Sequence, residues 1–253
     1  MTTQTGESPL AGLRTVVTGA SSGIGKAIAI AFAAAGARVG IGFRRSTDAA
    51  GALSIELGPG HPLLQADLST SEGCTSVVRQ AFDAMESIDG WVNNAGVDVL
   101  TGEARQWPAE KKLEALLEVD LKATIRCSRL VAERMRPGGC IINVGWDHAT
   151  IDGRAGGDPE LFAAVKAAVL GFSKSFARSV APDVRVNVLC PGWIETAFAV
   201  GVDRDFHAQV EANTPLGRWG QPQDVAGAAV WLASPASRFI TGQAINVNGG
   251  VVG

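Results

Sequence analysis

Apolar residues in this chain follow two alternating patterns, short unbroken runs and longer stretches with helical spacing. The first run, LRTVVTG at residues 13–19, is followed at residues 24–36 by an alanine-rich stretch that ends at a glycine. An unbroken apolar run indicates a strand buried on both faces, whereas an apolar stripe with a period of about 3.6 indicates a helix packed on one side. The chain is therefore predicted to open with a strand and a helix, and the glycine is expected to end that helix in a left-handed conformation.

The same alternation continues to the end of the chain. Further strands are expected at residues 37–43, 61–66, 88–94, 139–145, 184–189 and 244–248. Further helices are expected over about 47–57, 71–86, 108–136, 159–180 and 222–233, with a loop carrying short helices over about 192–221. This order predicts a mostly parallel, doubly wound sheet of the Rossmann type between two helix layers, a three-layer α/β/α fold. No linker or repeat divides the chain, so residues 11–253 are expected to form a single domain after a flexible tail at residues 1–10.

The composition narrows the possible partners. The chain of 253 residues is 46% apolar and has a net charge of -3 with scattered lysines and arginines, which argues against nucleic acid as a partner. No stretch is long and apolar enough to span a membrane, and the polar N-terminus lacks the pattern of a signal peptide. The cysteines form no CxxC pair and are expected to be buried free thiols, which fits a cytoplasmic location. They are Cys74, Cys127, Cys140 and Cys190.

A glycine-rich turn joins the first strand to the first helix, with the sequence TGASSGIG at residues 18–25. Gly19 would allow the tight turn, Gly23 would let the backbone approach a pyrophosphate, and Gly25 would let the helix pack closely on the strand. The helix N-terminus supplies free N–H groups and a partial positive charge to the phosphates. This context of strand, turn and helix predicts a dinucleotide site, and with it an NAD(P)-binding domain over residues 11–253.

The spacing of these glycines is one of several features that resemble the short-chain dehydrogenase/reductase family. The others are NNAG at residues 93–96, Asp67 in QADLS, Lys166 in its helix, the Pro191–Gly192 pair, and ITGQAINVNGG near the C-terminus. The resemblance covers about residues 11–250. It implies cofactor binding by Gly19, Ser21, Ser22, Gly23, Ile24, Gly25, Asp67, Leu68, Asn94, Ala95, Gly96, Lys166, Pro191, Gly192, Ile194 and Thr196.

The end of the second strand bears on the choice between the two nicotinamide coenzymes. An enzyme that selects NAD usually has a carboxylate here for the ribose 2′-hydroxyl, whereas this chain has Phe43 followed by Arg44 and Arg45. A guanidinium group matches a 2′-phosphate well. NADP(H) is therefore favoured over NAD(H), although the two arginines could also be ordinary solvated loop charges.

The same resemblance implies a catalytic set of Asn, Ser, Tyr and Lys, in which the Tyr protonates a carbonyl oxygen, the Ser positions that oxygen and the Lys holds the ribose. Lys166 matches the Lys, but Phe162 stands four residues earlier, where the Tyr is expected. Trp146 takes the place of the Ser, or Gly145 does if the register shifts by one residue, and Asp120 takes the place of the Asn. The chain contains no tyrosine that could substitute from another loop. The resemblance therefore predicts an atypical member with a rebuilt reaction site.

Charged residues near that site favour a different chemistry. Asp147 and His148 follow Trp146 at the C-terminal end of a strand, where open α/β sheets place their active sites, and are candidates for acid–base catalysis. Hydride addition to a ketone develops negative charge on oxygen and needs an acid or an oxyanion donor. An iminium acceptor is already positive, so a carboxylate such as Asp147 or Asp120 would stabilise it, and an indole face can bind a cation. The sequence therefore favours an NADP(H)-dependent reductase of an imine, iminium or hemiaminal substrate in specialised metabolism.

Three other functions stay open at this point. One is carbonyl reduction or alcohol oxidation with Asp147 or His148 as the acid, another is a cyclisation or dehydration without net redox change, and the third is a non-catalytic dinucleotide-binding protein. The resemblance also implies a homodimer or homotetramer built on the helices at 108–136 and 159–180. Trp193 is expected to line the same cleft. A substrate-facing lid is expected at residues 197–221, with the aromatic residues Phe198, Phe206 and Trp219.

Overall fold

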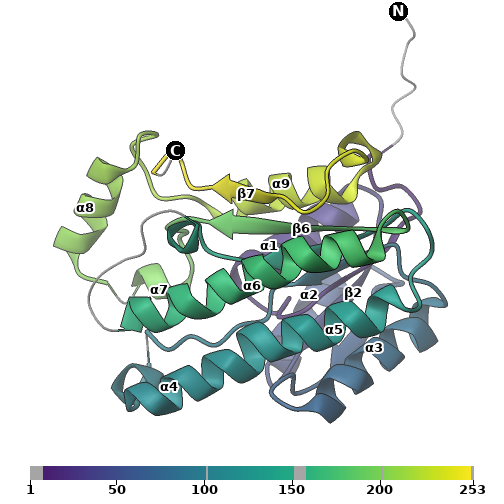
Figure 1. Ribbon diagram of the computed structural model, residues 1–253, viewed down its shortest axis with the longest axis horizontal. Helices are drawn as coiled ribbons and strands as arrows, with labels where there is room; N and C mark the ends of the chain where they lie inside the picture. Colours follow the sequence, from purple (N-terminus) through teal and green to yellow (C-terminus); the bar gives the residue numbers. More distant parts are fainter. Residues whose placement is uncertain (1–7, 101, 151–157, 201, 252–253) are drawn as a thin grey trace, which may run out of the picture.

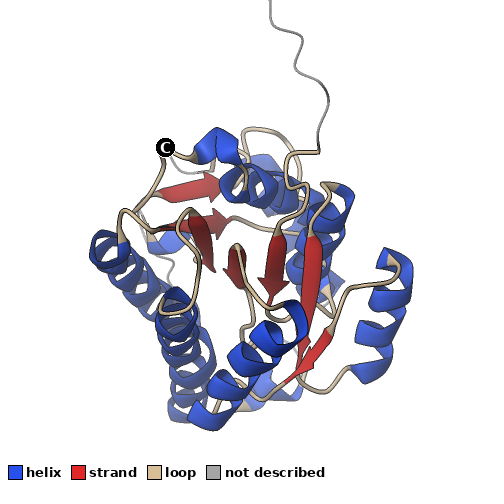
Figure 2. Ribbon diagram, turned by 90° about the vertical axis from the view of Figure 1, so that its right-hand side faces the viewer, coloured by secondary structure: helices blue, strands red, loops and turns tan. Residues whose placement is uncertain are grey.

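A computed structural model describes residues 8–100, 102–150, 158–200 and 202–251 of the chain. Seven strands form one sheet in the order β3-β2-β1-β4-β5-β6-β7, and every neighbouring pair is parallel. Their bounds are β1 Arg14–Val17, β2 Arg38–Phe43, β3 Leu63–Gln65, β4 Gly90–Asn93, β5 Gly139–Val144, β6 Val184–Pro191 and β7 Ala244–Val247. Figure 2 shows this sheet between two layers of helices, so the predicted three-layer Rossmann-type fold of a single domain is confirmed.

Helices cover both faces of the sheet, and a hydrophobic core lies between the sheet and each layer of helices. Val16 and Val17 are both fully buried in β1, and they belong to opposite cores because successive strand residues point to opposite faces. The core of Val17 lies under α1, α2 and α9, and the core of Val16 lies under α3, α5 and α6, which are nearer the viewer in Figure 1. The bounds are α1 Gly23–Ala34, α2 Thr47–Leu57, α3 Ser71–Met85, α4 Ala109–Leu116, α5 Ala123–Ala132, α6 Asp158–Val180, α7 Ala197–Val200, α8 Arg204–Asn213 and α9 Pro222–Ala233.

The long helix predicted over 108–136 consists of two α-helices, α4 and α5, joined directly by a π-helical turn. A π-helical turn at Leu117–Lys122 separates α4 from α5, and Figure 1 shows these two helices end to end. Within this turn the carbonyl of Asp120 accepts a hydrogen bond from the Thr124 hydroxyl at 2.8 Å. π-helical turns inside α-helices are frequent at functional sites, and this one brings the Asp120 side chain into the cleft described below.

The N-terminal boundary differs from the prediction. Residues 1–7 of the expected tail lie outside the described residues, but Leu10 is fully buried in the core under α1. The backbone N–H of Leu10 donates to the Ala35 carbonyl at 2.9 Å, and Gly36 adopts the left-handed conformation predicted for the end of α1, with φ of 92°. Leu10 therefore belongs to the domain, because its apolar side chain closes the end of this core.

All four cysteines are buried as free thiols in the described part of the chain, as predicted. Among the described residues, every helix is too short or too polar to cross a membrane.

Candidate functional site

A cleft of about 1350 Å³ lies at the carboxyl ends of the strands. The segments that follow β1 to β6 all contribute to its lining, as does α6 through Lys166. The strand order reverses between β1 and β4, and ligands of open α/β sheets bind at this kind of switch point. All of the predicted cofactor-binding residues lie along this cleft, including Ser21, Ser22, Ile24, Leu68 and Ile194.

The glycine-rich turn forms one wall of the cleft through its backbone. Gly19 and Gly23 have φ of 64° and 54°, a conformation that side-chain-bearing residues rarely adopt. A Cβ atom on Gly25 would lie 2.3 Å from the Gly19 carbonyl oxygen and 2.4 Å from the Asn94 side-chain nitrogen. α1 begins at Gly23, and the side chain of Ser22 makes no capping hydrogen bond. The first N–H groups of α1 therefore face a ligand site without a side-chain cap, as a pyrophosphate would require.

Thr18 links the turn to the segment after β4 by hydrogen bonds, a role that was not predicted from the sequence. Its hydroxyl accepts hydrogen bonds from the backbone N–H groups of Asn94 and Ala95, both at 3.0 Å, and donates to the Val92 carbonyl at 3.2 Å. The Asn94 side chain in turn donates to the carbonyls of Thr18 and Gly19. These bonds hold the NNAG segment and the glycine-rich turn in one rigid unit.

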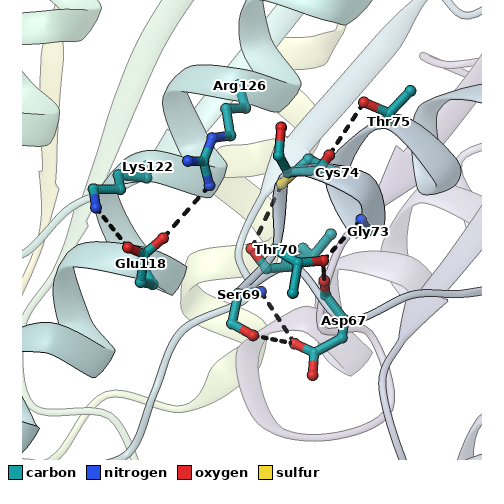
Figure 3. Close-up of polar contacts among 11 residues, drawn as sticks. Asp67, Ser69, Thr70, Gly73, Cys74, Thr75, Glu118, Lys122 and Arg126 are labelled. Atoms are coloured by element: carbon teal, nitrogen blue, oxygen red, sulfur yellow. Dashed lines mark hydrogen bonds and ion pairs between the residues drawn. The ribbon is translucent and has the colours of Figure 1, made fainter.

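The far end of the cleft combines the two arginines with a carboxylate. Arg44 lies 3.8 Å from Asp67 in an ion pair, and both side chains are about half exposed. Asp67 also accepts hydrogen bonds from the N–H and the hydroxyl of Ser69 (Figure 3). Burial raises the pKa of Asp67, but the bonds from Ser69 and the positive charges of Arg44 and Arg45 outweigh it, and the net pKa is lowered. This end therefore presents fixed positive and negative groups that could select a phosphorylated ribose.

The opposite end of the cleft contains a buried ion pair. Lys166 Nζ lies 2.9 Å from Asp120 Oδ2 and donates to the Val144 carbonyl at 3.1 Å. The second oxygen of Asp120 accepts the Val97 backbone N–H at 2.9 Å. The two side chains are only 7% and 2% exposed. Both residues were predicted as site residues, but their direct pairing was not, because the sequence does not reveal how far apart two helices lie.

Aromatic rings form the wall beside this ion pair. The centre of the Trp146 ring lies 5.3 Å from the centre of the Phe162 ring and 6.5 Å from that of the Trp193 ring, and both contacts are edge-on. All three residues line the cleft. Lys166 Nζ is 5.2 Å from the centre of the Phe162 ring. Phenyl and indole rings therefore occupy the positions where the resemblance implies a phenol and a hydroxyl.

Asp147 and His148 are not where the acid–base hypothesis requires them. Both are buried, and neither is among the described residues that line the cleft. Asp147 accepts hydrogen bonds from the His148 N–H at 2.8 Å and from the Asn248 side chain at 3.2 Å, and burial raises the pKa of Asp147. The short helical turn at Asp147–Ala149 directs this carboxylate toward the segment after β7. The prediction that these residues act on a substrate in the cleft is therefore not supported by their position.

The lid prediction is also changed by the packing. The ring centres of Phe206 on α8 and of Trp219 lie 5.2 Å and 5.9 Å from the centre of the Trp193 ring. Of these three residues, only Trp193 lines the cleft. The side chain of Phe198 lies outside the described residues. Phe206 and Trp219 therefore pack against the Trp193 ring and do not line the cleft themselves.

Sequence reasoning missed a second part of the cleft wall, near the start of α4. Trp107 and Lys111 both line the cleft, and Lys111 Nζ lies 3.9 Å from the centre of the Trp107 ring. Trp107 has extended backbone and lies before the start of α4 at Ala109, so this contact is not an i to i+4 pair of one helix, and helical spacing does not predict it. The segment lacks a family motif in the sequence, so it attracted no prediction.

Comparisons with known proteins agree with this geometry. A sequence model described as enoyl-(acyl carrier protein) reductase matches residues 19–252. The 3-oxoacyl-[acyl-carrier-protein] reductase of Vibrio harveyi is 37% identical over 249 residues, which cover 96% of this chain and 98% of the relative. A short-chain dehydrogenase from Burkholderia cenocepacia in complex with NADP has a TM-score of 0.87 and 31% identity, covering 96% of this chain and 99% of that one. A blue fluorescent protein from a metagenomic library, in complex with NADPH, has a TM-score of 0.87 and 32% identity over 97% of this chain and 100% of that one.

Proposed function

Because the chain belongs to the short-chain dehydrogenase/reductase family of oxidoreductases, we propose that it is an NADP(H)-dependent enzyme that reduces an imine, iminium or hemiaminal-type substrate. The glycine-rich turn and the uncapped start of α1 would hold the pyrophosphate, and Arg44 with Arg45 would hold the 2′-phosphate. Lys166 would hold the ribose, and Pro191 to Thr196 would lie along the nicotinamide. The bound coenzyme supplies the hydride.

The observation that carries the substrate proposal is the pair of rings at Phe162 and Trp146. A phenyl ring cannot donate a proton, so Phe162 cannot protonate an oxygen that becomes an alkoxide as hydride arrives. A protonated imine loses its charge in the same step and becomes a neutral amine, with no oxyanion to stabilise. The faces of Trp146, Trp193 and Phe162 would attract the cation through their π electrons.

The two carboxylates that were expected to stabilise an iminium ion have other partners in the structure. Asp147 does not line the cleft and accepts a hydrogen bond from Asn248, and Asp120 is paired with Lys166. Neither carboxylate therefore offers a free negative charge to an iminium ion. The proposal depends instead on the aromatic rings of the cleft wall and on the ion pair of Asp120 with Lys166, in which the two charges cancel.

Carbonyl reduction is the second candidate function, because relatives such as that of Vibrio harveyi are named 3-oxoacyl-[acyl-carrier-protein] reductases. The positions of Asp147 and His148 argue against either residue as the substitute acid. The ammonium group of Lys166, which lines the cleft, would then have to replace the missing phenol as the proton donor.

We also propose that the protein acts in specialised metabolism in the cytoplasm, as a homodimer or homotetramer. A rebuilt reaction end beside a preserved coenzyme site fits a substrate outside central metabolism. The proposed assembly would use α4 with α5, and α6, the helices that the family resemblance implies for the interface.

Consumption of NADPH with matched cyclic substrates tests the function. Purified protein would be given 2-methyl-1-pyrroline, 3,4-dihydroisoquinoline and their carbocyclic ketone analogues at equal concentrations. We expect kcat/KM for the imines to exceed that for the ketones by at least about tenfold, since no phenol supports the ketone reaction. Ketone turnover equal to or greater than imine turnover would refute the imine proposal and favour carbonyl reduction.

A further inference from the structure

The ion pair of Asp120 and Lys166 is built into the fold from several directions. The π-helical turn at Leu117–Lys122 presents Asp120 to the cleft, where one oxygen contacts Lys166 and the other accepts the Val97 N–H. Gly96 passes so close that a Cβ atom there would lie 2.8 Å from Asp120 Oδ2. The position of the carboxylate is therefore fixed by three separate elements of the chain.

Lys166 is held just as firmly at its charged end. Two of the three protons of its ammonium group are directed to Asp120 and to the Val144 carbonyl. The same nitrogen lies 5.2 Å from the Phe162 ring, beside the aromatic wall of the reaction end. Any substrate held against Phe162 therefore lies within a few ångströms of this charge.

A buried ammonium group without a counter-ion would repel a second cation strongly at that distance, because little water is present to screen it. The neutral asparagine that the family resemblance implies at position 120 would leave that repulsion in place. The carboxylate of Asp120 cancels it. A cation can then approach the faces of Trp146 and Phe162, which attract it.

We propose that Asp120 is a specificity-determining positioning residue, which neutralises Lys166 and so allows the reaction end to accept a cationic substrate in place of a neutral carbonyl compound. This inference rests on the proposed function for its biological meaning, since iminium ions are the cations concerned. Its physical content is a preference in binding that can be measured without any turnover.

The test uses two ligands of the same shape and size, phenyltrimethylammonium and tert-butylbenzene. Only the first carries a charge, and neither contains a C=N or C=O bond that could accept hydride. Dissociation constants would be measured by calorimetry on the NADPH-loaded protein. In Asp120→Asn, which keeps the size and the hydrogen-bond acceptor, we expect the constant for the cation to rise at least tenfold and that for the neutral ligand to change less than twofold.

Glu133→Gln is the control for loss of one negative charge outside the cleft. Glu133 follows directly after α5, is exposed and is not among the residues that line the cleft. We expect this variant to bind both ligands within twofold of the wild type. The double variant Asp120→Asn/Lys166→Met removes both charges, and its constant for the cation should return to within threefold of the wild type.

The inference is overturned if Asp120→Asn weakens the binding of both ligands alike, if Glu133→Gln has the same effect as Asp120→Asn, or if the double variant binds the cation as weakly as Asp120→Asn. The wild type provides a test that does not depend on the folding of any variant. If it binds tert-butylbenzene but rejects phenyltrimethylammonium by tenfold or more, the inference also fails. Absence of imine turnover with a preserved preference for the cation would instead refute the proposed function and leave this inference standing.

Discussion

The two ends of the cleft are built from different parts of the polypeptide. At the coenzyme end the shape comes from the backbone, through left-handed glycines and the uncapped N-terminus of α1. At the reaction end it comes from side chains, namely the ion pair of Asp120 with Lys166 and the rings of Trp146 and Phe162. Backbone geometry restricts a position to one or two residue types, whereas side chains on a fixed backbone can be exchanged. Substitutions at the reaction end should therefore be tolerated more easily than substitutions at the coenzyme end.

The largest effect is expected at Gly25, where the backbone leaves no space. A Cβ atom would lie 2.3 Å from the Gly19 carbonyl oxygen, so the turn must move in Gly25→Ala. We expect a loss of about 3 kcal/mol in the free energy of unfolding and of about 100-fold in NADPH affinity. Thermal unfolding and NADPH fluorescence titration measure the two quantities.

Gly51→Ala is the control for that substitution. Gly51 lies inside α2, and a Cβ atom there would meet nothing within 4 Å. Removing glycine from a helix interior should stabilise the protein by about 0.5 to 1 kcal/mol and leave NADPH binding unchanged. If Gly25→Ala behaved like Gly51→Ala, the coenzyme end would not depend on its backbone as described.

At the reaction end, Phe162→Tyr should restore a proton donor without moving the backbone. We expect kcat for ketones to rise about 100-fold, the lower range for a positioned general acid, and kcat for imines to change by less than about threefold. Steady-state assays with both substrate classes give the two numbers. Phe172→Tyr adds the same hydroxyl elsewhere on α6, where Phe172 stacks on Phe176, and should change neither rate. Equal ketone rates in the two variants would show that Phe162 is not at the reacting position.

An intermediate effect is expected at Arg44, the proposed partner of the 2′-phosphate. Arg44→Asp would remove this charged group, and NADPH affinity should fall about 30-fold, the range for a hydrogen bond to a charged group. NADH has no phosphate there, so its affinity in the same variant is the internal control. Titration with both coenzymes would contradict the assignment if the two affinities fell equally or if NADPH binding were unchanged.

The smallest effect is expected at Asp147, behind the reaction end. Burial raises the pKa of Asp147 above its unfolded value, so this group favours the folded state at low pH, and that contribution is lost as pH rises through the folded pKa. Asparagine does not titrate. The stability of Asp147→Asn relative to the wild type should therefore increase from about pH 4 to about pH 7, by about 1 kcal/mol or less. Thermal unfolding across this range would disprove the assignment if the relative stability decreased.

The sequence predicted the fold well because local signals there are strong. The predicted helices at 47–57 and 222–233 match α2 and α9 in the structure, and the buried strand at Val16 and Val17 lies between two cores. Leu10 was misplaced because a single leucine after a polar segment has no periodic pattern, and its burial depends on Ala35 and the rest of the core.

Site residues could be predicted where a sequence motif fixes the backbone. They were harder to predict where the orientation of a side chain depends on contacts with distant parts of the chain. Every predicted coenzyme residue lies along the cleft. Asp147 follows a strand end, which made it a reasonable candidate, but its orientation depends on Asn248, 101 residues further along the chain. The pairing of Asp120 with Lys166 likewise depends on how the π-helical turn packs on α6, which periodicity does not reveal.

The π-helical turn also affects how this protein can be engineered. A turn with i to i+5 hydrogen bonds holds one residue more than an α-helical turn, and each residue advances a helix by about 100°. The extra residue lets Asp120 face the cleft while Cys127, further along, faces the core against α3. Deleting one residue here would straighten the helix but rotate everything beyond it, so the segment at Leu117–Lys122 should keep its length in any chimera or shortened variant.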